Sequence, residues 1–183
     1  QWLMKTLSGI GRPDLALGIA LKKTYPSWGY MITHGATTIW ELWNFDTAAP
    51  DMNSQNHVMM LGDLLVWFYE NLAGIRTDPA KPAFRRIVMN PDFPEGLDFV
   101  EASTIGFRKN REQVAADEAQ KTEWNIRMPA NCSAEVHFPA AAREKITESG
   151  HTVAADDENI RYRGTVNGKQ VFEVLSGEYS FVF

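Results

Sequence analysis

Cysteine is nearly absent from this sequence of 183 residues, in which Cys132 stands alone. A single thiol excludes an internal disulfide, so noncovalent packing must hold the fold, and the redox compartment stays open. The sequence also lacks an apolar run of the roughly 20 residues that a membrane-spanning helix requires. Residues 1–5 lack the basic-then-apolar order of a signal peptide and are typical of the middle of a helix. We therefore expect the chain to be part of a longer protein.

Positive charge is also scarce, since 18 Lys and Arg against 23 Asp and Glu give a net charge of -5 at pH 7. The basic pairs Lys22-Lys23 and Arg85-Arg86 are too short for a nucleic-acid patch, so no such partner is predicted. The motifs of acyl transfer (Gly-x-Ser-x-Gly) and of phosphate binding (Gly-x-x-x-x-Gly-Lys, Gly-x-Gly-x-x-Gly) do not occur. His34 and His57 lack a third ligand at a suitable spacing, so neither a metal nor a cofactor is predicted.

The apolar pattern changes period near residues 74–84, from helical spacing to alternation. On the helical side, segment 13–23 is predicted to form a helix. Pro13 would take its first position, and Lys22-Lys23 would lie in its last turn, where they complement the helix dipole. Apolar side chains around most of its circumference predict burial on more than one side.

A second helix is predicted over residues 54–73, where Phe68 and several leucines recur three or four positions apart. Ser54 would cap its start and Gly74 would end it. Residues 24–53 between the two helices are rich in Gly, Thr, Pro and aromatic residues. A loop this long is usually functional or disordered, and disorder would leave three tryptophans in water. We therefore predict an ordered, site-forming loop with at most one short turn of helix.

Beyond residue 84 the pattern predicts seven or eight short strands without helices between them. Apolar and polar residues alternate over 123–128 and over 134–138, which indicates strands buried on one face. Asn167-Gly168 is typical of a hairpin turn, and Ser176-Gly177 separates the last two strands. The prediction is a two-part α+β chain that ends in an antiparallel, jelly-roll-like β-sandwich.

Residues 25–32 read Tyr-Pro-Ser-Trp-Gly-Tyr-Met-Ile, and residues 35–41 read Gly-Ala-Thr-Thr-Ile-Trp-Glu. Together with Met-Asn-Ser-Gln-Asn-His at 52–57 and the tail motif Ser-Gly-Glu-Tyr at 176–179, this string resembles the bacterial α-L-rhamnosidases of glycoside hydrolase family 78. The resemblance spans nearly the whole chain in unbroken order. It implies that residues 1–75 are the last helices and the active-site loop of an (α/α)6 catalytic barrel, and that residues 76–183 are its C-terminal β-sandwich.

The resemblance implies inverting hydrolysis of terminal α-L-rhamnosyl groups. The partners would be a rhamnose-containing saccharide or glycoside and the rest of the catalytic domain. It assigns the general base to Glu41 and places His57 at the sugar. Among the aromatic residues of the loop, Trp28 is the predicted sugar contact, because Gly29 beside it permits close approach. No residue of the chain matches the general acid, so the chain alone is expected to be inactive.

The sequence departs from the family pattern at three places: Leu42 follows the glutamate, His34 precedes Gly35, and residues 103–123 lack the usual Ser-Pro-Tyr-Gly hairpin. The first two bear on sugar preference rather than on reaction type.

Several alternatives stay open. Glu41 would otherwise cap a helix or pair with Arg12, His57 would be satisfied by nearby backbone, and most aromatic rings would serve packing. The functional alternatives are a non-catalytic carbohydrate-binding or scaffold module, and an (α/α)6 glycosidase acting on another sugar. An apolar helical side without partners also predicts association, which includes a homo-oligomer.

Overall fold

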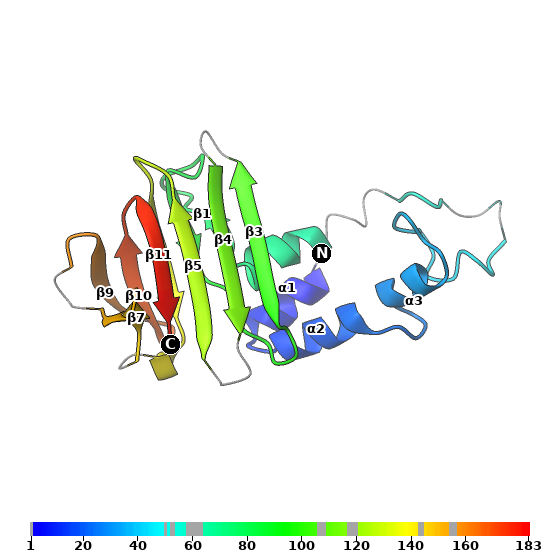
Figure 1. Cartoon of the computed structure of the whole chain (residues 1–183). Helices are drawn as coiled ribbons and strands as arrows, with labels where there is room; N and C mark the ends of the chain where they lie inside the picture. Colours follow the sequence, from blue (N-terminus) through cyan, green and yellow to red (C-terminus); the bar gives the residue numbers. More distant parts are fainter. Residues whose placement is uncertain are drawn as a thin grey trace. The chain divides into compact units, whose positions relative to one another are not determined.

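The structure is a computed structural model that describes residues 2–49, 51, 54–57, 64–105, 109–116, 121–142, 145–153 and 157–183. The chain forms two compact units, residues 1–68 with 93–95 and residues 69–92 with 96–183 (Figure 1). The first holds helices and the second holds strands, as predicted. The units divide after residue 68, and the domain boundary placed after residue 75 stays a prediction. None of the described helices is both long enough and apolar enough to cross a bilayer.

The helical unit contains α1 (Trp2–Gly9), α2 (Pro13–Leu21) and α3 (Trp28–Thr33). Pro13 begins α2, as predicted, because its fixed φ suits a first helical position. The predicted last turn is wrong: Lys22 has ψ 131°, so α2 ends at Leu21 and both lysines lie beyond it.

A buried hydrogen bond ties the two ends of this unit together. The indole Nε1 of Trp67 donates to Ser8 Oγ at 2.9 Å, and the two residues lie 59 positions apart. Met4, Ala16 and Trp67 are fully buried around this bond. Residues 64–67 therefore pack on the inner side of α1, where the hydroxyl satisfies the one polar atom of the indole.

The predicted helix over 54–73 is only partly confirmed. Residues 64–67 are helical and continue into a π-helical turn, Phe68–Leu72, but residues 54–57 are not helical. Ser54 is therefore not a helix cap, and its hydroxyl accepts a hydrogen bond from Asn56 N at 3.1 Å. The reason is tertiary, because the backbone of this segment pairs with residues 39–41 instead of coiling. Residues 58–63 of the predicted helix lie outside the described residues.

The strand unit is built from two sheets. The five-stranded sheet has the order β1 (Ile75–Thr77), β2 (Arg86–Met89), β6 (Ser133–Phe138), β10 (Lys169–Val174), β9 (Ile160–Val166). The six-stranded sheet has the order β3 (Phe99–Ile105), β4 (Lys109–Ala116), β5 (Thr122–Met128), β11 (Gly177–Val182), β7 (Thr147–Glu148), β8 (His151–Thr152). A short 3-10 turn, Ala140–Ala142, follows β6.

All of these pairs are antiparallel except β2 with β6, which run parallel. The predicted antiparallel-rich sandwich is confirmed. Beyond residue 84 the described residues contain ten strands, β2 to β11, more than the seven or eight expected, because β7 and β8 are too short to show a period.

Aromatic rings fill the space between the sheets. Phe138 on β6 lies with its ring centroid 5.3 Å from Trp124, 5.1 Å from Phe181 and 5.2 Å from Phe183, each in an edge-to-face geometry. Phe172 approaches the same ring at 5.6 Å. The predicted alternation is confirmed on β5, where Trp124, Ile126 and Met128 are buried between exposed or half-exposed neighbours.

Two turns of this unit depend on a left-handed backbone. Asn167 and Gly168 both have positive φ, 49° and 77°, and connect β9 to β10 as the predicted hairpin. Gly74 follows the π-helical turn with φ +71°, and a Cβ atom there would lie 2.1 Å from the backbone nitrogen of Pro91. This glycine is therefore required both by its conformation and by the chain that crosses it.

Substituting Gly74 with alanine should destabilise the chain by more than about 2 kcal/mol, because the side chain meets both left-handed strain and a backbone clash. Gly150→Ala is the matched control, since Gly150 has φ +81° but open space around its Cβ position. The control should lose only about 1 kcal/mol, the cost of the conformation. Urea unfolding measures both free energies, and equal losses would contradict the crossing argument.

Candidate functional site

The site-forming loop begins with α3, whose start is fixed by a buried serine. Ser27 is 1% exposed, and its Oγ accepts a hydrogen bond from Tyr30 N at 2.9 Å, which caps the helix. Next to it, a Cβ atom on Gly29 would lie 2.4 Å from the carbonyl oxygen of Lys22. The backbone that approaches Gly29 closely is thus that of Lys22, just after the end of α2. The expectation that this glycine leaves room for a ligand beside Trp28 is corrected on that point.

A pocket of about 360 Å³ lies within the helical unit. Its lining is mostly apolar and includes Met31, Ile32, Ile39 and Leu64, together with the side chains of Trp28 and His57. Within the described residues, the buried Nε1 of Trp28 and the buried Nδ1 of His57 have no hydrogen-bond partner. Buried polar atoms are normally satisfied, so the partners of these two would come from outside the described residues.

Glu41 lies beside this pocket and not among the residues that line it. Its side chain is exposed, and its Oε2 accepts a hydrogen bond from the backbone nitrogen of Ser54 at 3.0 Å. Arg12, the alternative partner, instead pairs with Asp14 at 2.8 Å. Its side chain bonds Ser54 N, which is not part of a described helix, so Glu41 is not seen to cap one. Its carboxylate is therefore held at one oxygen, and its remaining lone pairs face solvent.

Four hydrogen bonds join the segment that carries Glu41 to the segment that carries His57. Two are between backbone atoms, Glu41 N to Ser54 O at 2.9 Å and His57 N to Ile39 O at 2.8 Å. The third is the bond to the Glu41 carboxylate, and the fourth runs from Thr38 Oγ1 to the carbonyl oxygen of Gln55 at 2.5 Å. We call residues 38–41 and 54–57, joined in this way, the paired segments. His57 is consequently not in the first turn of a helix.

The other aromatic residues of the loop serve mainly to pack it. Trp40 is 6% exposed and lies against Phe45, with ring centroids 5.6 Å apart. Trp43 meets Trp28 edge to face at 5.3 Å. Trp40 therefore anchors the chain in the interior directly before Glu41. Trp43 packs against the indole of Trp28, which lines the pocket.

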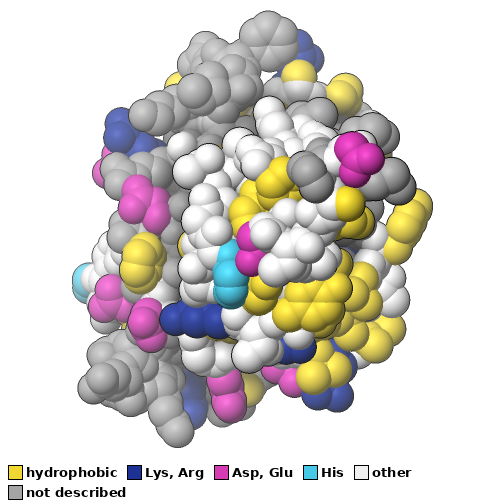
Figure 2. Space-filling view, turned by 90° about the vertical axis from the view of Figure 1, so that its right-hand side faces the viewer, with side chains coloured by type: hydrophobic (Ala, Val, Ile, Leu, Met, Phe, Trp, Pro, Cys, Tyr) yellow, Lys and Arg dark blue, Asp and Glu magenta, His cyan; other side chains and the backbone are white. Residues whose placement is uncertain are grey.

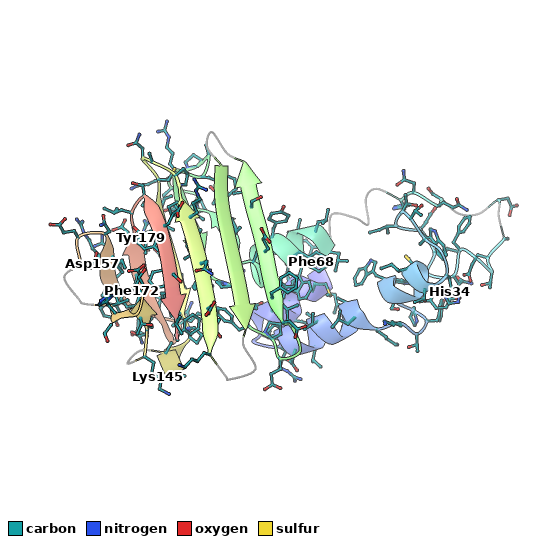
Figure 3. All side chains as sticks on the ribbon, viewed as in Figure 1. His34, Phe68, Lys145, Asp157, Phe172 and Tyr179 are labelled. Carbon is teal, nitrogen blue, oxygen red and sulfur yellow. The ribbon has the colours of Figure 1, made fainter. Side chains whose placement is uncertain are left out.

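His34 lies at the end of α3 (Figure 3). Its ring stacks on the ring of Tyr30, with ring centroids 3.8 Å apart. The Tyr30 hydroxyl donates to the carboxylate of Asp46 at 3.3 Å. Desolvation and the neighbouring Asp46 raise the pKa of Tyr30. Tyr30 and His34 thus stabilise the outer side of the loop.

The structure brings Trp28 and His57 into one pocket and holds Glu41 next to it through the paired segments. Sequence reasoning did not single out Thr38 or Ser54 as partners of this arrangement. Their contacts reach 17 and 13 positions along the chain, a separation that carries no local pattern. Among the described residues, no group of three or more His, Cys, Asp or Glu side chains is placed to hold a metal ion.

The helical unit also presents exposed apolar side chains. Figure 2 shows hydrophobic side chains gathered on the face of the chain that holds α3. Trp2 is 82% exposed, Ile32 70% and Ile10 66%. Apolar surface of this extent is typical of a face that packs against another element.

Two stretches of the chain match sequence profiles of known domains. Residues 1–72 match the profile described as the bacterial alpha-L-rhamnosidase 6 hairpin glycosidase domain. Residues 74–153 match the bacterial alpha-L-rhamnosidase C-terminal domain. The two matches follow each other in the same order as the helices and strands.

The curated relatives include two α-L-rhamnosidases. That of Streptomyces avermitilis is 33% identical over 190 residues, which cover 98% of this chain and 17% of that protein. That of Alteromonas sp. (strain LOR) is 30% identical over 181 residues, which cover 96% of this chain and 19% of that protein. The chain thus spans about a fifth of the length of these relatives.

Solved structures agree with these relatives. The crystal structure of Streptomyces avermitilis alpha-L-rhamnosidase complexed with L-rhamnose matches 99% of this chain and 17% of its own, with a TM-score of 0.82 and 28% identity. The alpha-L-rhamnosidase from Dictyoglumus thermophilum matches 98% of this chain and 20% of its own, with a TM-score of 0.78 and 29% identity. The succession of helices and sandwich is therefore shared with these structures.

Gly29→Ala should displace the start of α3 from the end of α2, because the new methyl group would overlap the Lys22 carbonyl. We expect a loss of stability of about 2 kcal/mol and a change in the fluorescence of the adjacent Trp28. Gly18→Ala, inside α2 with open space at its Cβ position, is the control and should be neutral or stabilising by up to about 1 kcal/mol. Unfolding curves followed by tryptophan emission test both variants. A Gly29→Ala variant as stable as the control would show that α3 does not depend on this contact.

Proposed function

Because the chain belongs to the family of bacterial α-L-rhamnosidases, we propose that it is a segment of an inverting glycoside hydrolase that removes terminal α-L-rhamnosyl groups. In this proposal the helical unit supplies the general base and part of the sugar pocket, and the strand unit is the sandwich that follows the catalytic domain. The observation that carries it is the position of Glu41, an exposed carboxylate held by Ser54 beside a pocket with unsatisfied polar atoms.

Inverting hydrolysis uses two carboxyl groups about 6.5–9.5 Å apart. One protonates the leaving oxygen, and the other accepts a proton from the water that attacks the opposite face of the sugar. Glu41 suits the second role, because a base must stay ionised and reach water. Its exposed side chain can reach water, and the bond from Ser54 N fixes one oxygen. The other oxygen is left to orient the water.

The pocket suits a deoxy sugar on chemical grounds. Rhamnose carries a methyl group in place of a hydroxymethyl group, so one side of its ring is apolar and the other presents hydroxyl groups. Met31, Ile32 and Ile39 offer apolar contact, whereas Trp28 Nε1 offers a hydrogen-bond donor and His57 Nδ1 a polar partner. We therefore propose that Trp28 and His57 bind the sugar.

The proposal requires two contributions from the rest of the enzyme. The general acid would come from another part of the catalytic domain, because no second carboxylate of the chain was matched to that role. The same domain would cover the exposed apolar side chains of the helices, such as Trp2 and Ile10. The partners are thus a rhamnose-containing saccharide and the remaining helices of the barrel.

Glu41→Gln in the full-length enzyme should lower kcat by at least about 100-fold, because the amide cannot accept the proton from water. Substrate binding should change little, since the variant keeps the size of the side chain and most of its contacts. Steady-state kinetics on an aryl α-L-rhamnoside separates kcat from KM. Glu178→Gln, on the exposed surface of β11, is the matched control and should retain wild-type kinetics. A Glu41→Gln variant with near wild-type turnover would remove Glu41 from the mechanism.

The isolated chain of 183 residues should not hydrolyse rhamnosides, because one carboxylate cannot act as acid and base in an inverting reaction. It should also bind rhamnose weakly, since the pocket would lack the walls of the missing barrel. An aryl-glycoside assay and calorimetry test these two expectations. Hydrolysis by the chain would contradict the assignment of the acid to another segment, and tight binding without hydrolysis would favour a carbohydrate-binding module.

A further inference from the structure

Glu41 and His57 are connected through the paired segments, and the connection closes a loop. Residues 42–53 leave one segment and return to the other, and closing a loop of this length costs conformational entropy. The four hydrogen bonds between residues 38–41 and 54–57 oppose that cost. The position of the Glu41 carboxylate relative to the His57 ring therefore depends on whether the paired segments stay together.

Thr38 is the one place where a side chain other than that of Glu41 makes these bonds. Two of the four join backbone to backbone, and a third uses the carboxylate of Glu41 itself. The Thr38 hydroxyl donates to the Gln55 carbonyl, which lies between Ser54 and His57 in the chain. A substitution at Thr38 can thus remove one bond while the backbone and the carboxylate keep all their atoms.

The bond from Thr38 to Gln55 lies between the residue that holds Glu41 and the residue His57 itself. Ser54, on one side of Gln55, supplies the N–H that holds Oε2 of Glu41. His57, two residues on the other side, is one of the residues that line the pocket. Trp40 holds the opposite segment in the interior, so motion would be confined to residues 54–57. Without the bond to Gln55, three bonds still join the segments, so Ser54 and His57 would stay paired but would be held less rigidly against Glu41.

We propose that Thr38 is a positioning residue for catalysis, which acts through the Gln55 carbonyl to keep Ser54 against Glu41 and so fixes the orientation of the general base. This inference rests on the proposed role of Glu41. Thr38 also lines the pocket, so a direct contact with substrate is the competing explanation. The two differ in the kinetic constant that they affect, because orienting the base acts on kcat and a substrate contact acts on KM.

The test uses Thr38→Val in the full-length enzyme, which replaces the hydroxyl with a methyl group of similar size. We expect kcat to fall about tenfold with KM within about twofold, which is the effect of one net hydrogen bond on the reactive geometry. Thr38→Ser keeps the hydroxyl and should restore at least half of the wild-type kcat. Thr33→Val is the matched control: its hydroxyl bonds carbonyls of its own helix and the adjacent His34 ring, none of which belongs to the paired segments, and its kinetics should be unchanged.

A double-mutant cycle distinguishes positioning from a general loss of structure. Adding Thr38→Val to Glu41→Gln should lower the residual kcat by less than about twofold, since the base that Thr38 positions is already absent. A further tenfold loss in that background would overturn the proposal, and so would a rise in KM at unchanged kcat. If Thr38→Val lowers the melting temperature, Thr38→Ala tests the same bond without placing a methyl group at the position of the hydroxyl.

The outcome for Glu41 separates this inference from the proposed function. If Glu41→Gln retains turnover, the general base is wrongly assigned and Thr38 has nothing to position. If Glu41→Gln abolishes turnover while Thr38→Val and Thr38→Ala both keep the wild-type kcat, the base assignment stands and the positioning role is refuted.

Discussion

The backbone pairing between residues 39–41 and 54–57 is the constraint on which the candidate site depends. It satisfies the amide groups of a segment that would otherwise be an irregular loop, and it removes residues 54–57 from the helix that their sequence favours. By doing so it holds the carboxylate of Glu41 and the imidazole of His57, 16 positions apart in the chain, on two adjacent segments. Trp40, between Ile39 and Glu41, is buried and anchors the first of these segments in the interior.

The two compact units differ in how completely they bury their apolar side chains. The strand unit encloses its own aromatic core, in which Phe138 meets rings from both sheets, and its apolar side chains are largely inside. The helical unit leaves large apolar side chains such as Trp2 and Ile32 exposed. This difference agrees with the proposal that the sandwich is a domain in its own right, whereas the helices belong to a larger barrel.

The chemistry proposed for the site requires a carboxylate that is wet but oriented. Full burial would oppose the charge of a base, and complete freedom would lose its alignment with the water. A single bond from a backbone amide, together with an exposed side chain, lies between these extremes. In the proposed function, the sugar would occupy the neighbouring pocket and the water would lie at Glu41, so one loop would serve both needs.

The amino-acid sequence by itself determined the succession of helices and strands, because alternation on β5 and β6 and the turn at Asn167-Gly168 are local patterns. It also carried the resemblance to the family, since the strings at residues 25–32 and 35–41 are local patterns. The helix predicted from Ser54 failed because a cap preference of about 1 kcal/mol is weaker than pairing with a distant segment. The proximity of Trp28, Glu41 and His57, and the part of Thr38 in it, were decided only by tertiary structure, because hydrogen bonds between segments 13 to 17 residues apart leave no periodic trace in the sequence.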